Sequence, residues 1–218
     1  MTRTAYLFSG LGADERVFDQ LNLHIDQKRC IKWVSSKNGE GLTEYAQRIV
    51  DEQFGISDNE SIILVGVSFG GIVTREVSKI IDFEKLILIS SIKTRHEIPR
   101  IYRIAGFLKL HFWIPANFLK SANFLNYRLF GVKNREQKLV LKSILKDTDS
   151  HFLKWAMNEI VNWENESVSE KTTHIHGTDD HIIPVRFVKN AIKILGGGHL
   201  MILTHSQELD SIINDQLK

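Results

Sequence analysis

The stretch SIILVGVSFGGIVTREVSKII, from Ser61 to Ile81, decides the fold of this chain. Its apolar start, Ile62–Val65, is typical of a strand that is buried on both faces. After Gly-Val-Ser68-Phe-Gly, apolar residues recur at helical spacing. A strand that enters a helix through Gly-x-Ser-x-Gly is the setting of an exposed, nucleophilic serine. The glycines fit this interpretation, because a side chain at Gly66 or Gly70 would collide where strand and helix cross.

The motif alone is also compatible with a glycine-rich turn that contains an incidental serine. Gly and Ser are common residues, so a single Gly-x-Ser-x-Gly is a moderate signal. It becomes a strong one if an acid and a histidine follow in the right order.

Length and composition favour one soluble domain. The chain has 218 residues, 43% of them hydrophobic, which suffices for one sizeable core spanning residues 1–218. A single cysteine, Cys30, excludes an intrachain disulfide. We expect it to pack at the start of a strand. No apolar segment has the length of a signal peptide or a membrane span, so the expected location is the cytoplasm.

Charge is distributed unevenly along the chain. The net charge is +2, but the segment from Lys93 to Lys146 holds 12 Lys or Arg against 2 acids, Glu97 and Glu136. The remainder holds 16 basic against 24 acidic residues. One segment is therefore strongly basic and the rest acidic.

Strands and helices alternate along most of the sequence, which predicts a mostly parallel α/β sheet of about six strands flanked by helices. The expected strands are residues 4–8, 31–34, 62–65, 86–90, 172–176 and 191–195. The expected helices include residues 42–54, a helix starting at Pro184 and a C-terminal helix from about Ser206.

The alternation stops between about residues 93 and 165. This insertion is helix-like and rich in aromatic residues, and we expect it to form a helical cap. We expect Trp155 and Trp163 to pack in the core, and Asp14 and Arg16 to anchor the loop after the first strand.

Two segments offer partners for Ser68. The first is HGTDDHIIP, His176–Pro184, and the second is the triple glycine that leads to His199. Both follow expected strands, and catalytic groups gather at the carboxyl ends of parallel strands. The order Ser, Asp, His is the one expected for this type of serine turn.

These three motifs together resemble the α/β-hydrolase fold family over essentially the whole chain. By this resemblance we expect the sequence to lack the first two antiparallel strands of larger members, which leaves the six strands and a compact cap. The resemblance implies a serine hydrolase that acts on an ester or thioester through an acyl-enzyme.

The resemblance also implies a role for each residue. Ser68 is the nucleophile, His199 accepts the serine proton and returns it to the leaving group, and Asp180 orients the histidine. Asp180 fits the motif spacing better than its neighbour Asp179. The oxyanion hole is expected to use the backbone N–H groups of Phe69 and Leu11. Leu11 is less certain because Ser9-Gly10 replaces the usual His-Gly start of that loop.

The cap provides candidates for binding the substrate. An aromatic floor with a basic rim suits an acyl chain that bears an anionic group or is attached to a carrier. The alternative is a helical cap with a solvated basic face, because Arg and Lys stems can cover apolar surface while their charges stay in water. A merely solvated face would mix both signs of charge, which this segment does not. The residues selected for this role are Phe107, Phe112, Trp113, Arg100 and Arg103.

Other functions remain open at this point. A metal site at His174, His176, Asp179, Asp180 and His181 is disfavoured, because no further ligand is evident, and no metal or organic cofactor is expected. A non-catalytic binding protein could share the fold, and a basic, aromatic cap could lie on a membrane surface, although this is not favoured. An amidase, lactonase or perhydrolase would use the same three residues. No nucleic-acid partner is expected.

Overall fold

The computed structural model describes residues 1–57, 59–109 and 123–218. Its centre is a six-stranded sheet in the order β2-β1-β3-β4-β5-β6, in which every neighbouring pair is parallel. The strands are β1 Thr2–Phe8, β2 Gln27–Cys30, β3 Glu60–Val67, β4 Lys85–Ile89, β5 Thr172–Gly177 and β6 Ile192–Ile194. The predicted six-stranded α/β architecture is confirmed.

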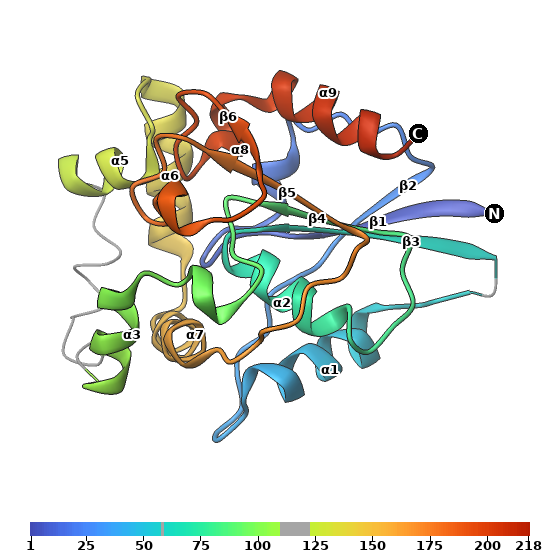
Figure 1. Cartoon of the computed structure of the whole chain (residues 1–218), viewed down its shortest axis with the longest axis horizontal. Helices are drawn as coiled ribbons and strands as arrows, with labels where there is room; N and C mark the ends of the chain where they lie inside the picture. Colours follow the sequence, from blue (N-terminus) through green and yellow to red (C-terminus); the bar gives the residue numbers. More distant parts are fainter. Residues whose placement is uncertain (58, 110–122) are drawn as a thin grey trace.

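Helices cover both faces of the sheet (Figure 1). Helices α1 (Leu42–Gln53) and α2 (Phe69–Val77) lie on one face, and α8 (Met201–Thr204) and α9 (Ser206–Gln216) lie on the other. A short 3₁₀ turn, η1 (Glu15–Phe18), follows β1. The helices between β4 and β5 gather at the end of the sheet where the strands finish; they are α3 (Arg100–Phe107), α5 (Phe124–Phe130), α6 (Arg135–Asp147) and α7 (Ser150–Asn162).

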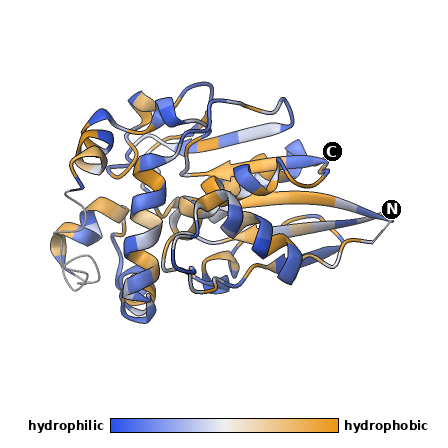
Figure 2. Ribbon diagram, turned by 90° about the horizontal axis from the view of Figure 1, so that it is seen from below, coloured by the Kyte–Doolittle hydropathy of each residue, from blue (hydrophilic) through white to orange (hydrophobic). Residues whose placement is uncertain are grey.

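Two hydrophobic cores, one on each face, hold these layers together. Along β1, Leu7 enters the core beneath α8 and α9, whereas Tyr6 and Phe8 enter the core beneath α1 and α2. Successive strand residues point to opposite faces, so a sheet covered on both sides needs strands that are apolar throughout. The central strands are accordingly hydrophobic (Figure 2).

The second strand is the main error of the sequence prediction. It was expected at residues 31–34 but forms at Gln27–Cys30, which is polar and largely exposed. This strand lies at the sheet edge, so burial does not require apolar residues there. The apolar residues that follow it pack into the core in an extended segment, where Trp33 lies 5.5 Å from Phe69 between ring centroids. Cys30 is exposed, so the expectation that it packs was wrong.

In the insertion between β4 and β5, α7 is bonded to α2 and to the loop before α1. The indole N–H of Trp155 donates to the Glu40 carbonyl (2.7 Å), and that of Trp163 donates to the Glu76 carboxylate (2.8 Å). Both tryptophans pack as expected, because each buries its ring while satisfying its N–H. A 3₁₀ segment, η2 (Arg95–Glu97), precedes α3.

Two smaller differences occur near the C-terminus. The helix expected from Pro184 is a single 3₁₀ turn, η4 (Val185–Phe187), and the last strand spans Ile192–Ile194, two residues fewer than expected. In the described ranges, every helix is too short or too polar to cross a membrane.

Close packing around the serine turn explains its glycines. A Cβ at Gly66 would lie 2.5 Å from the Gly71 Cα, and a Cβ at Gly70 would lie 2.2 Å from the Ser9 carbonyl oxygen. The atoms in the way belong to the backbone, so they cannot move without distorting the turn or the end of β1.

We therefore expect Gly70→Ala to lower the free energy of unfolding by roughly 3 kcal/mol, or to prevent folding, because the added methyl overpacks the junction. Gly55→Ala is the control, since the atom nearest to its added Cβ, a side-chain nitrogen of Arg29, would be 3.8 Å away. It should change stability by less than about 0.5 kcal/mol. Urea unfolding of both variants checks this, and equal stability would contradict the packing argument.

Candidate active site

Ser68 lies in a strained turn between β3 and α2. Its φ is 53° and its ψ −120°, a conformation that costs a non-glycine residue about 1–3 kcal/mol. Three hydrogen bonds hold it there. The Ser68 N–H donates to the Ile89 carbonyl (2.9 Å), and the Ser68 carbonyl accepts from the Gly71 N–H (2.9 Å) and from the Ser91 hydroxyl (2.7 Å).

Sequence analysis missed the role of Ser91. It follows β4, the neighbour of the β3 strand that carries Ser68, and it is fully buried. The available signal was the position of a hydroxyl at the carboxyl end of a strand next to the serine turn.

The structure brings Ser68, His199 and Asp180 into one hydrogen-bonded chain. The Ser68 Oγ is 2.8 Å from His199 Nε2, and His199 Nδ1 is 2.8 Å from Asp180 Oδ2. A carboxylate only accepts hydrogen bonds, so it places the imidazole proton on Nδ1 and leaves Nε2 free to accept from Ser68. This arrangement prepares the hydroxyl to lose its proton to the ring.

Asp180, rather than Asp179, contacts the histidine. Asp180 is 3% exposed, and its Oδ1 accepts the backbone N–H groups of Ile182 (2.9 Å) and Ile183 (2.8 Å). The side chain of Asp179 is exposed and accepts a hydrogen bond from Thr178 (3.2 Å).

The loops that carry the acid and the histidine touch through glycines. A Cβ at Gly177 would lie 2.1 Å from the Gly197 carbonyl oxygen, and the Asp179 N–H donates to that same oxygen (2.9 Å). The absence of side chains therefore lets Asp180 and His199 approach each other.

Asp180 stays ionised although it is buried. Burial acts to raise the pKa of its carboxyl, but the adjacent His199 and the N–H donors outweigh burial and hold the pKa below its ordinary value. The site thus keeps a negative charge beside the imidazole, where it stabilises the protonated ring.

The two expected oxyanion donors flank the serine. Phe69 is the first residue of α2, and its N–H belongs to the helix end, where backbone N–H groups lack helical acceptors. The loop that contains Leu11 lies against the serine, because a Cβ at Gly10 would be 3.5 Å from the Ser68 Cβ. Within the described part of the chain, neither of the two N–H groups donates to another residue.

Several contacts fix this first loop. Arg16 Nη2 forms an ion pair with Asp14 (2.6 Å), the Ser9 hydroxyl donates to the Ala13 carbonyl (2.7 Å), and the Trp33 indole donates to the Gly10 carbonyl (3.3 Å). Asp14 and Arg16 anchor the loop as expected.

The cap residues selected from the sequence are not brought to Ser68 in the part that the structure describes. Phe107 is 85% exposed, Arg100 is exposed and Arg103 is half-buried. The other two, Phe112 and Trp113, lie outside the described residues. The cap does reach the histidine loop, since the ring of Phe130 lies 5.9 Å from that of His199.

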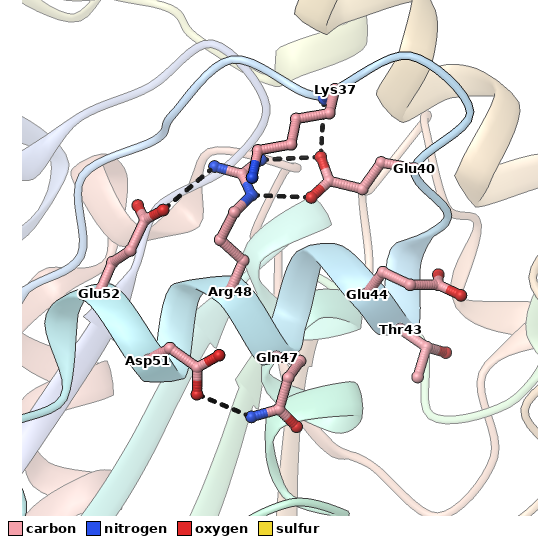
Figure 3. A pocket seen from close by; sticks show the side chains of 8 residues that line it. All are labelled: Lys37, Glu40, Thr43, Glu44, Gln47, Arg48, Asp51 and Glu52. Carbon is pink, nitrogen blue, oxygen red and sulfur yellow. Dashed lines mark hydrogen bonds and ion pairs between the residues drawn. The ribbon is translucent and has the colours of Figure 1, made fainter.

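Two hollows lie outside the hydrogen-bonded chain. One, of about 290 Å³, adjoins the first loop at Gly12–Glu15, and its walls combine apolar rings, Trp33 and Phe152, with acids such as Asp147. The other, of about 630 Å³, lies over α1 and is lined by polar and charged residues (Figure 3). In the second, Arg48 pairs with Glu40 and Glu52, and the lining as a whole is acidic, with four carboxylates against Lys37 and Arg48.

The hydrogen bonds of the two β5 histidines argue against a metal site. His174 Nε2 donates to the Ser91 carbonyl (3.0 Å), and His176 Nε2 donates to the Ile183 carbonyl (2.8 Å). Burial, the adjacent His176 and Lys93 lower the pKa of His174 to about 3, and burial lowers that of His176. Among the described residues, no group of three or more His, Cys, Asp or Glu is arranged to hold a metal ion.

Comparison with solved structures matches this architecture over nearly the whole chain. A lipase-esterase related protein from Clostridium acetobutylicum aligns at a TM-score of 0.67 and 14% identity, covering 98% of this chain and 93% of that one. This chain has the α/β-hydrolase fold. An esterase from Thermogutta terrifontis (TM-score 0.67, 14% identity, 98% and 89% covered) has the same fold.

Polyneuridine aldehyde esterase aligns over 100% of both chains at a TM-score of 0.65 and 14% identity. No family model and no curated protein matches the sequence. At these identities the α/β-hydrolase likeness establishes the fold, and function must be argued from the site.

Proposed function

We propose that the protein is a serine hydrolase that cleaves a carboxylic ester or thioester through an acyl-enzyme on Ser68. The observation that carries this proposal is the chain of hydrogen bonds from Ser68 through His199 to Asp180, 2.8 Å at each step. The esterase names of proteins with the same fold add support.

In the first half of the reaction, the Ser68 oxygen attacks the carbonyl carbon and its proton passes to His199 Nε2. The carbonyl oxygen becomes negative and accepts hydrogen bonds from the Phe69 and Leu11 N–H groups. The carbon–oxygen or carbon–sulfur bond then breaks, and the imidazolium gives its proton to the departing alcohol or thiol.

In the second half, water attacks the acyl-enzyme and gives a proton to His199 Nε2. The Ser68 oxygen leaves with that proton, which releases the carboxylic acid and restores the enzyme. Asp180 remains ionised throughout and stabilises each imidazolium. The sequence of steps needs no metal or organic cofactor.

Other reactions of the same three residues give distinct outcomes in one assay. A panel of p-nitrophenyl esters of increasing chain length, run beside an amide, a lactone, and a carboxylic acid with hydrogen peroxide, ranks the esterase proposal against amidase, lactonase and perhydrolase activity. A binding protein would turn over none of them. Co-sedimentation with lipid vesicles tests the membrane-surface alternative.

We expect replacement of Ser68, His199 or Asp180 to lower kcat by roughly 10⁴-fold, with little further loss in double variants, because the three act as a unit. A fluorophosphonate probe should label Ser68 alone. Full activity, or labelling, in Ser68→Ala would refute the mechanism.

The neighbouring aspartate provides a matched control. Asp180→Asn removes the charge that orients His199, so it should cripple turnover while leaving the fold intact. Asp179→Asn makes the same chemical change one residue away on an exposed side chain, and its effect should be much smaller.

We also propose that the preferred substrate carries an anionic group, free or on a carrier. Arg100 and Arg103 form no ion pair with any of the described carboxylates, so both guanidinium groups are available to attract an anion. Asp14 and Asp147, which line the hollow beside the first loop, are already paired with Arg16.

The expected result is a higher kcat/KM for an anionic ester than for a neutral ester of equal length, with an advantage that fades as salt screens the charges. The double variant Arg100→Glu, Arg103→Glu should lose this preference for the anionic ester. The control Lys142→Glu, at an exposed position of α6, should retain it. Equal responses of the two esters to salt and to charge reversal would contradict this proposal.

A further inference from the structure

His176 lies beneath the proposed active site but outside its three-residue chain. It is on β5, four residues before Asp180, and its side chain is 0% exposed. Its Nε2 is 2.8 Å from the Ile183 carbonyl oxygen and 3.4 Å from Asp180 Oδ2. Because a carbonyl only accepts hydrogen bonds, the Nε2 carries a hydrogen. The ring is a neutral donor, since burial lowers its pKa.

His176 and Ile183 together surround the Asp180 carboxylate. Ile183 donates its N–H to Asp180 Oδ1 (2.8 Å), and its carbonyl accepts from His176. His176 Nε2 also lies 3.4 Å from Oδ2, the oxygen that accepts from His199 Nδ1 (2.8 Å). Ile183 is therefore held at both ends, and the carboxylate is fixed between the backbone on one side and two imidazoles on the other.

We propose that His176 is a positioning residue, which holds the Asp180 loop so that Oδ2 is presented to His199. Its catalytic consequence rests on the hydrolase function proposed above. Its role in orienting Asp180 concerns the resting protein and can be measured without turnover. Since the ring is fully buried, it acts through Asp180 and makes no contact with substrate.

A matched set of variants separates positioning from general stability. His176→Leu removes the donor, whereas His176→Gln places an amide N–H near the position of Nε2. If the leucine variant does not fold, His176→Asn replaces it, because the shorter amide cannot reach Ile183. Ile175→Val is the control for lost packing, since Ile175 is adjacent on β5 and fully buried in the opposite core.

The expected kinetic result is a loss of about tenfold in kcat for His176→Leu, the upper end of what one neutral hydrogen bond contributes. KM should remain within about twofold, because substrate binding is untouched. His176→Gln should recover most of kcat, and Ile175→Val should retain it despite a lowered melting temperature.

Proton NMR supplies the readout that does not depend on activity. The His199 Nδ1–H, hydrogen-bonded to Asp180, should give a resolved downfield signal in the wild type, His176→Gln and Ile175→Val. In His176→Leu this signal should broaden by exchange. If no variant hydrolyses any ester but the signal behaves in this way, the proposed function fails and the positioning role stands.

A wild-type His199 signal in the variant without the donor would overturn the proposal. A kcat loss no larger than that of Ile175→Val, or a failure of His176→Gln to restore either readout, would also overturn it.

Discussion

The strained backbone of Ser68 is the constraint on which the site depends. A residue at φ 53° relaxes unless its neighbours forbid it, and here three hydrogen bonds from Ile89, Gly71 and Ser91 fix its backbone. Those partners belong to β4, α2 and the loop after β4, so the turn exists only when the centre of the sheet is assembled. The free energy of folding thereby maintains the strained turn that holds the Ser68 hydroxyl at the carboxyl end of β3.

The rest of the site is brought to this hydroxyl by the sheet order. β4 lies between β3 and β5, and the acid and histidine loops follow β5 and β6. Gly177 and Gly197 let those two loops touch, and Asp180 and His199 meet above them. Parallel strands put all their carboxyl ends at one edge, which makes residues 131 positions apart in sequence neighbours.

Local signals explain what could be predicted from the sequence. The buried central strands and the glycine-bounded Ser68 follow from apolar runs and steric limits that act over a few residues. The edge strand β2 does not, because its position depends on pairing with β1 and its side chains face solvent. Ser91 carried only a positional signal, a hydroxyl at the end of the strand next to the serine turn, and its partner and that of His176 could not be predicted, since both contacts are made across strands whose register no single segment specifies. The exposure of Phe107 shows that an aromatic composition does not by itself direct side chains toward a substrate.

The proposed mechanism requires that Ser68 becomes covalently acylated during turnover. The most direct measurement is rapid acid quenching of the protein with a p-nitrophenyl ester, followed by intact mass and peptide mapping. The expected result is a mass increase of one acyl group, confined to Ser68 and its peptide, at the time of a p-nitrophenol burst. Turnover without any adduct, or an adduct on another residue, would contradict it.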